Sequence, residues 1–116
     1  MQDEAVDAYL KSLAIRGDYF DANYNLGALY FNEAVQMVNE ANDMWSPKLS
    51  KAEAAKQKEL EEGGKAMFST ALPYLESALD VDPNDKETLR SLRDIYARVG
   101  MDDKMLEVSA KLKSMD

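Results

Sequence analysis

Residues 24–30 read Tyr24-Asn25-Leu26-Gly27-Ala28-Leu29-Tyr30, and this stretch decides the fold because it belongs to a pattern that the chain repeats. When the sequence is moved 66 residues along itself, four residues find identical partners: Ala5, Leu13, Leu26 and Tyr30 fall on Ala71, Leu79, Leu92 and Tyr96. A shift of 34 places Met105, Leu106 and Leu112 on Ala71, Leu72 and Ala78. The two shifts differ by 32 residues, so the simplest interpretation is a repeat of 34 residues with one insertion of 32. Repeats of this length form stacked pairs of helices.

The residues in the matching positions resemble those of a tetratricopeptide repeat. Leu26, Gly27 and Tyr30 form a Leu-Gly-x-x-Tyr motif, and the later small, aromatic or apolar, small and proline positions are filled by Ala71, Leu75, Ala78 and Pro83. The resemblance implies an all-α superhelix of about five antiparallel helices, with one hairpin elongated by the 32-residue insertion. It divides a single domain, residues 1–116, into the second helix of a truncated repeat (1–19), a repeat with the long hairpin (20–85) and a C-terminal repeat (86–116).

The local signals predict where each helix begins and ends. Apolar spacing predicts helices over residues 3–15 and 20–43, with Gly17-Asp18 between them. Ser50 and Glu53 form a capping box for a third helix, which Gly63-Gly64 is expected to weaken or interrupt and Pro73 to kink. Asp85 is expected to cap a helix that runs to about residue 99, Gly100 to end it, and residues 102–114 to form the last helix.

Composition and charge exclude several classes of function. The chain has no Cys and no His, so the usual nucleophiles, bases and zinc ligands are missing; we expect no enzyme, no cofactor and no metal site. Net charge is −8, and residues 1–43 carry eight acids against Lys11 and Arg16, which makes nucleic acid an unfavourable partner. The stretch 80–85 is rich in Asp, but Asp85 stands where a calcium loop needs Gly. No apolar run is long enough to span a membrane.

The resemblance also implies a binding surface. In this family the first helix of each pair lines a concave groove that holds a segment of another protein. Here the groove positions are Asp21, Tyr24, Ala28, Phe31, Glu87, Arg90, Asp94 and Ala97. Tyr24 and Phe31 are either aromatic anchors for a partner or packing residues of the extended hairpin, and Arg90 is a candidate to pair with a partner carboxylate.

Trp45 is the only tryptophan, and it lies at the expected tip of the long hairpin. It is either an anchor for a partner or a side chain that folds back over its own turn, and we expect the second arrangement. Met37, Met44 and Met67 are expected in the hairpin core, and the charged run 51–62 on a solvated helix face.

The sequence therefore predicts a non-enzymatic scaffold that binds a protein or peptide in its concave groove. Two alternatives remain open: a structural, self-associating segment of a longer repeat protein, and an adaptor that positions a catalytic partner. If the chain pairs with itself, the exposed helix 3–15 (Val6, Tyr9, Leu10 and Leu13) or the hairpin is the expected contact, which would make a homodimer. The chain begins within a repeat, so we expect a missing preceding helix; the sequence leaves the compartment undecided, whether cytoplasmic or exported.

Overall fold

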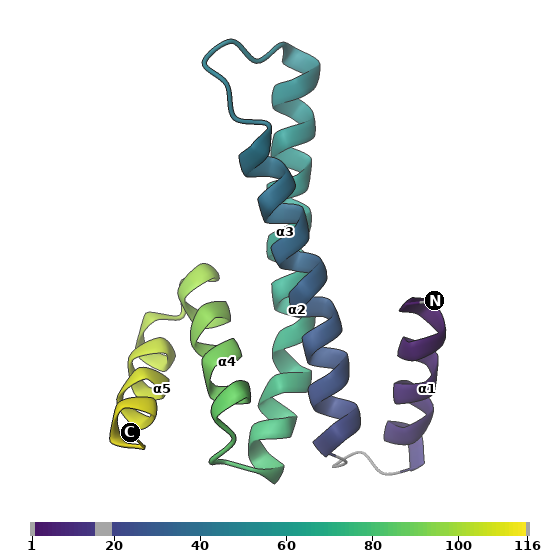
Figure 1. Ribbon diagram of the computed structural model, residues 1–116, viewed down its shortest axis with the longest axis vertical. Coiled ribbons are helices and arrows are strands. Elements are labelled where there is room, and N and C mark those ends of the chain that lie inside the picture. Colours follow the sequence, from purple (N-terminus) through teal and green to yellow (C-terminus); the bar gives the residue numbers. More distant parts are fainter. Residues whose placement is uncertain (1, 16–19, 116) are drawn as a thin grey trace.

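The computed structural model describes residues 2–15 and 20–115, and these residues form helices joined by short turns, without any strand (Figure 1). The helices are α1 (Gln2–Ile15), α2 (Phe20–Asp43), α3 (Lys51–Val81), α4 (Lys86–Arg98) and α5 (Asp102–Ser114). The fold is all-α, as predicted, and the bounds of α2 and α5 are those expected from the sequence. The expected cap at Asp18 and the turn at Gly17 lie outside the described residues.

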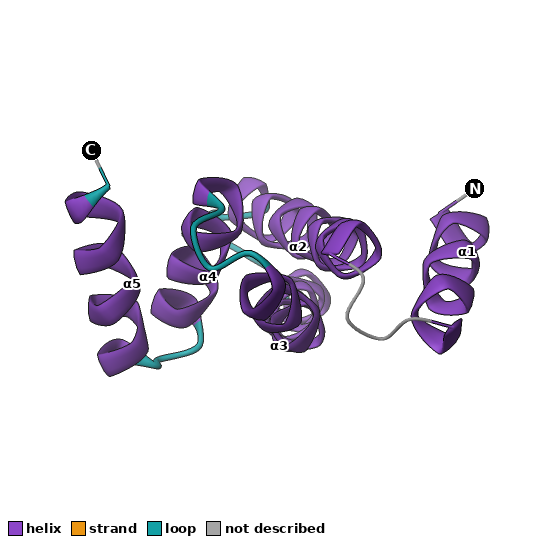
Figure 2. Ribbon diagram, turned by 90° about the horizontal axis from the view of Figure 1, so that it is seen from below, coloured by secondary structure: helices purple, strands orange, loops and turns teal. Residues whose placement is uncertain are grey.

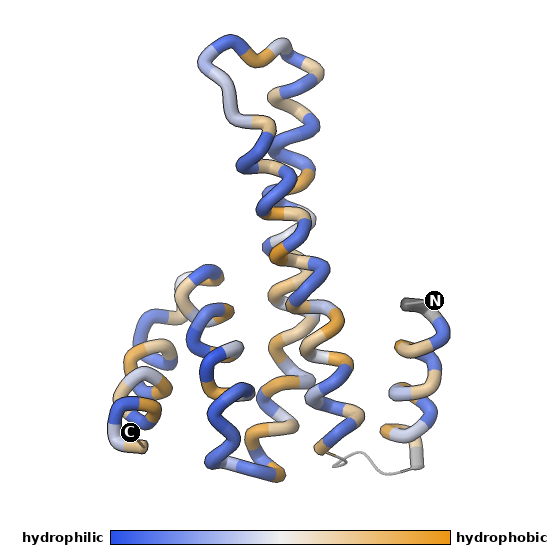
Figure 3. The backbone as a smooth tube through the Cα atoms, in the orientation of Figure 1, coloured by the Kyte–Doolittle hydropathy of each residue, from blue (hydrophilic) through white to orange (hydrophobic). Residues whose placement is uncertain are grey.

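The pair α2–α3 is a long antiparallel hairpin that rises beyond its neighbours (Figure 1). At 1.5 Å per residue, α2 is about 36 Å long and α3 about 46 Å, compared with about 20 Å for α4. The predicted tip is confirmed: α2 ends at Asp43, and the turn leads to the capping box in which Ser50 and Glu53 each accept the other's backbone N–H. The upper part of the hairpin is mostly hydrophilic (Figure 3), and only Leu60 is buried within residues 51–62, as expected of a solvated face.

Small residues let α2 and α3 pack closely. A methyl group added at Gly27 would lie 2.5 Å from Cγ of Leu75, and one at Gly64 would lie 2.9 Å from Cγ2 of Val38. Higher up, the side-chain amide of Gln57 donates to the Ala41 carbonyl oxygen at 2.9 Å, which joins α3 to the end of α2. The two helices therefore touch along most of their length.

Of the two effects expected at Gly63-Gly64, interruption is wrong, because α3 is continuous from Lys51 to Val81, and weakening stays a prediction. Each glycine costs about 1 kcal/mol of helix propensity relative to Ala. Gly64 is buried against α2, so close packing offsets that cost. Pro73 is exposed and the helix continues through it; the kink stays a prediction.

The main core lies where α4 and α5 pack against the lower half of the hairpin. It joins side chains of α2 and α3 to those of α4 and α5: Ala34, Phe68, Ala71, Leu75, Leu89, Leu92, Ile95, Tyr96, Val108 and Leu112. Stacked rings of Tyr30 and Tyr74, with centroids 5.8 Å apart, extend the contact between α2 and α3. Met67 packs on the same core, as expected. Met37 packs against Gly63 and Gly64 across the hairpin, as expected of a hairpin-core residue, and Met44 is half-buried near the tip.

The connections around α4 follow the sequence signals. Asp85 accepts the backbone N–H of Thr88 at 2.9 Å and its hydroxyl at 2.6 Å, so the predicted N-cap is confirmed. Gly100 has φ +80°, a left-handed conformation that suits glycine, and the following Met101 N–H donates to the Tyr96 carbonyl at 2.8 Å. These two caps set the length of α4.

The first helix stands at the other side of the molecule. Among the helices, α1 packs on α2 alone, and seen from below it lies at the opposite end of the row from α5 (Figure 2). Val6, Tyr9 and Leu13 are half-buried, whereas Leu10 is 41% exposed. At the other end, α5 buries Val108 and Leu112 and exposes Leu106.

The close approach at Gly27 can be isolated by comparing Gly27→Ala with Gly63→Ala. Both substitutions gain the same helix propensity. The new methyl at position 27 meets fully buried Leu75, while the one at position 63 meets the flexible end of Met37. We expect Gly27→Ala to be less stable than Gly63→Ala by about 1–3 kcal/mol, measured by urea unfolding followed by helical circular dichroism. Equal stabilities would contradict close packing at Gly27.

A second test concerns Tyr96, which ties α4 to α3. Its hydroxyl donates to Glu76 Oε2 at 2.8 Å, and Lys104 of α5 lies 3.6 Å from the same carboxylate. We expect Tyr96→Phe to lower the free energy of unfolding by about 1–2 kcal/mol at pH 7, because a charge-assisted hydrogen bond is lost.

The pH dependence of that difference gives an internal control. Burial, followed by the Glu76 carboxylate, raises the pKa of Tyr96 above its ordinary value near 10. Because the folded-state pKa exceeds the unfolded one, the stabilisation is complete below about pH 10 and falls as the pH rises further. The difference in free energy of unfolding between the original protein and Tyr96→Phe should be constant from neutral pH to about pH 9. It should decrease above pH 10. A difference in free energy of unfolding that increases above pH 10 would contradict this expectation.

Candidate functional site

The eight residues predicted to line a groove form two stripes, one on α2 and one on α4. Residues 21, 24, 28 and 31 follow a spacing of three or four, as do residues 87, 90, 94 and 97, so each set shares one helix face. Asp21 is exposed, and Tyr24, Ala28 and Phe31 are half-buried. Glu87, Arg90, Asp94 and Ala97 are all exposed. We call these eight residues the α2–α4 surface.

At the lower end of the α2 stripe, Tyr24 lies near acidic residues at the beginning of α4. Tyr24 stacks on Phe20, with ring centroids 5.8 Å apart and an angle of 9° between the ring planes. Burial raises the pKa of the Tyr24 hydroxyl, and the carboxylates of Glu87 and Asp85 raise it further. The ring of Tyr24 therefore lies within the negative field of the beginning of α4.

The Phe31 ring serves the hairpin core. It meets the Phe68 ring edge to face, with centroids 5.5 Å apart and an angle of 70° between the planes. Of the two roles open from the sequence, packing is the one that this contact shows for Phe31. Tyr24 is half-buried and also packs against the core, but its stacked ring partner, Phe20, belongs to its own helix and lies one turn away.

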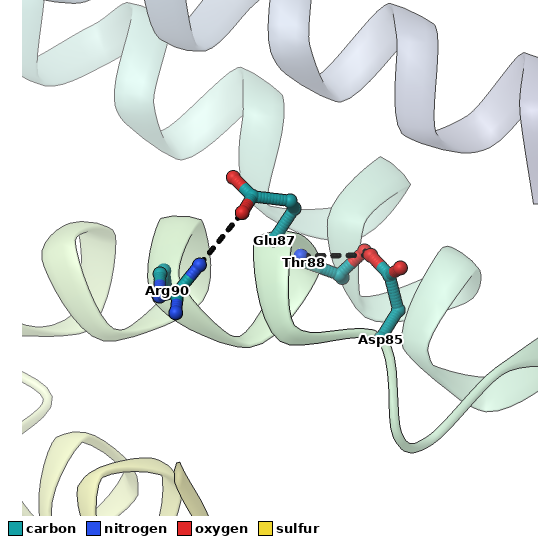
Figure 4. A network of polar contacts seen from close by, with 4 residues as sticks. All are labelled: Asp85, Glu87, Thr88 and Arg90. Atoms are coloured by element: carbon teal, nitrogen blue, oxygen red, sulfur yellow. Dashed lines mark hydrogen bonds and ion pairs between the residues drawn. The ribbon is translucent and has the colours of Figure 1, made fainter. Parts of the chain in front are cut away.

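Arg90 already has a partner within its own helix. Its Nη1 donates to Glu87 Oε1 at 2.7 Å (Figure 4). Both side chains are more than half exposed, and an exposed pair of this kind contributes only about 0–1 kcal/mol. A carboxylate from another protein can therefore replace Glu87 at small cost. On the same helix, Figure 4 shows Asp85 turned back onto Thr88 at the cap, so this carboxylate serves the helix end.

A hollow lies beyond the upper ends of both stripes. It has a volume of about 230 Å³ and is lined by Val38, Glu61, Lys65, Phe68 and Arg98. Val38 lies seven residues after Phe31 on α2, and Arg98 four residues after Asp94 on α4, so each continues its stripe. Extending the stripes by one or two turns would have found these two residues from the sequence. Lys65 and Glu61 gave no such signal, because their place depends on how α3 packs against α4.

Arg98 closes one side of the hollow by lying over an aromatic ring. Its guanidinium carbon is 5.0 Å from the centroid of Phe68, within the range of a cation–π contact. Phe68 itself is buried, so its ring forms part of the floor and of the core at once.

The expectation that Trp45 folds back over its turn is wrong. Its side chain is 72% exposed, the most exposed large apolar residue among those described. The turn contains the apolar residues Pro47 and Leu49, but they do not cover the indole. Trp45 is therefore a second exposed feature, at the far end of the hairpin from α4.

Two further observations bear on what the site can do. Among residues 2–15 and 20–115, no cluster of three acidic side chains is placed to hold a metal ion. In the same part of the chain, no helix is both long and apolar enough to cross a membrane.

No protein-family model matches the chain, and no curated protein resembles it in sequence.

Proposed function

We propose that the chain is a non-enzymatic protein-interaction module of the tetratricopeptide type, which holds a segment of another protein on the α2–α4 surface. The proposal combines the repeat pattern of the sequence with the accessibility of the two stripes. Opposite faces of α2 and α4 carry buried residues such as Leu26, Leu89 and Leu92, whereas the stripes remain open or half-open. A helix pair that buries one face and leaves the other open offers a preformed surface to a partner.

One observation carries the proposal: on α4 all four stripe residues are exposed, and their only described ion pair is the weak one between Glu87 and Arg90. On α2 the aromatic ring of Tyr24 stands opposite this end of α4 and supplies apolar area. Aromatic residues and arginine are the side chains that most often dominate binding energy. Tyr24 and Arg90 are therefore the proposed anchors.

The chemistry of the described residues favours binding over catalysis. The chain lacks His and Cys, and the groups with raised pKa values, Tyr24, Tyr30 and Tyr96, owe them chiefly to burial. The Tyr96 hydroxyl is engaged with Glu76 in the packing of α3 on α4. Binding another protein on the α2–α4 surface needs no nucleophile, acid or base.

Affinity capture from a lysate of the source cells tests this function. The original chain is compared with Tyr24→Ala/Arg90→Glu and with a control at the hairpin tip, Trp45→Ala/Lys48→Glu, which makes equivalent changes at exposed positions. We expect a protein that the original chain and the tip variant retain and the Tyr24/Arg90 variant loses by at least about tenfold, as two anchors of about 1 kcal/mol or more imply. Helical circular dichroism establishes that both variants are folded.

The opposite pattern would contradict the proposal. A protein retained by the Tyr24/Arg90 variant and lost by the tip variant would move the binding site to Trp45. Identical capture by all three chains would show that the α2–α4 surface makes no contribution.

A second function, self-association through α1, has its own observation. Leu10 is 41% exposed, and α1 packs on α2 alone among the helices. If α1 joins two copies, light scattering should show a mass that rises from one chain to two with concentration, and Leu10→Glu should keep it at one chain. A mass of one chain at all concentrations would exclude this function.

A further inference from the structure

The hollow at the upper end of the α2–α4 surface has a charge unlike that of the chain as a whole. The chain carries a net charge of −8, but the hollow is lined by two cations, Lys65 and Arg98, against one anion, Glu61. No side-chain hydrogen bond or ion pair joins any of these three to another described residue. The two exposed cations therefore face the same small space as one anion, Glu61, with which neither forms an ion pair.

The geometry of Arg98 leaves its hydrogen-bond donors usable. The guanidinium lies over the face of Phe68, 5.0 Å from the ring centroid. The N–H donors of a guanidinium lie in its plane and point outward, so a ring contact at this distance leaves donors available. A carboxylate can therefore approach the edge of Arg98 and accept two hydrogen bonds while the ring contact persists.

The other two residues that line the hollow are apolar, and the hollow itself is small. Val38 comes from α2 and Phe68 from α3, and both lie against the charged groups in the same space. A volume of about 230 Å³ is below the usual range for a whole small-molecule ligand, about 300–1,000 Å³. The hollow fits a single side chain and the charged group beside it.

The balance of charges selects an anion. A bound cation would gain Glu61 and be repelled by Lys65 and Arg98, whereas a carboxylate would gain both cations and be repelled by Glu61 alone. The negative charge of the rest of the chain opposes an anion at long range, but salt at about 0.1 M screens charges more than about 10 Å apart. Contacts of 3–4 Å inside the hollow are screened far less.

We propose that the hollow lined by Val38, Glu61, Lys65, Phe68 and Arg98 is a binding site for a carboxylate carried next to one apolar side chain. Lys65 and Arg98 hold the carboxylate, and Val38 and Phe68 contact the apolar group. In the interaction module proposed above, this site receives an acidic residue of the partner segment and so fixes which end of the segment lies beyond α4. That last step rests on the proposed function, whereas the carboxylate site itself does not.

Three small probes test the site without any knowledge of the partner. The full chain, labelled with ¹⁵N, is titrated with N-acetylphenylalanine, with its uncharged amide and with the cation phenethylamine, and the amide and Arg98 Nε–H signals are followed by NMR. We expect the acid to bind with a Kd of about 1 mM or weaker, in line with its size. The changes in chemical shift caused by the acid should centre on residues 38, 61–68 and 98. The amide should bind several-fold more weakly, and the amine should bind weakest.

Charge variants assign the roles of the residues. Lys65→Gln and Arg98→Gln should each weaken binding of the acid by about two- to fivefold, and Glu61→Gln should strengthen it by a similar factor, as expected for partly exposed charges. Lys56→Gln makes the same charge change at an exposed position of the same helix and should leave binding unaltered.

Several results would overturn the carboxylate site: shifts spread over the surface, an amine that binds as well as the acid, or equal effects of Arg98→Gln and Lys56→Gln. These results are independent of the capture experiment. A carboxylate site that fails here leaves Tyr24 and Arg90 as anchors, and capture that fails leaves the carboxylate site intact.

Discussion

The close contact between α2 and α3 is the constraint on which the other features depend. Gly27 lies against Leu75, and Gly64 against Val38, so the two long helices can run side by side with their backbones near each other. This contact makes the hairpin a single rigid support. Its lower half gives α4 and α5 an apolar surface to pack on, and its middle supplies three of the five residues around the hollow from α3.

The polar contacts around α4 place that helix relative to the hairpin. Tyr96 and Glu76 join α4 to α3, and Lys104 brings α5 to the same carboxylate. At the upper end of α4, Arg98 lies over Phe68. Both contacts lie in the last turn of α4, and the face with Glu87, Arg90 and Asp94 is open to solvent. The same packing therefore buries one face of α4 and leaves the opposite face exposed.

Much of the fold could be predicted because its signals are local. The capping box at Ser50, the cap at Asp85 and the stop at Gly100 each involve residues within a few positions, and the structure confirms all three.

Gly63-Gly64 misled the prediction because the cost of glycine in a helix is local, while its compensation comes from α2, about 25 residues away in sequence. Trp45 was misjudged because the direction of its side chain depends on the conformation of the hairpin turn, which no local motif in the sequence specifies. For the candidate site, the helix periodicity placed both stripes on their faces, but it could not show the Glu87–Arg90 pair or bring Lys65 next to Arg98, since that requires the register between α3 and α4.

We propose that one side of the molecule, formed by α2 and α4, receives another protein. Hydrogen–deuterium exchange of the chain alone and in complex with a captured partner tests this. We expect slower exchange in residues 20–38 and 86–98 when the partner is bound, with little change at the hairpin tip. Protection confined to residues 44–50, or to the outer helices α1 and α5, would contradict it.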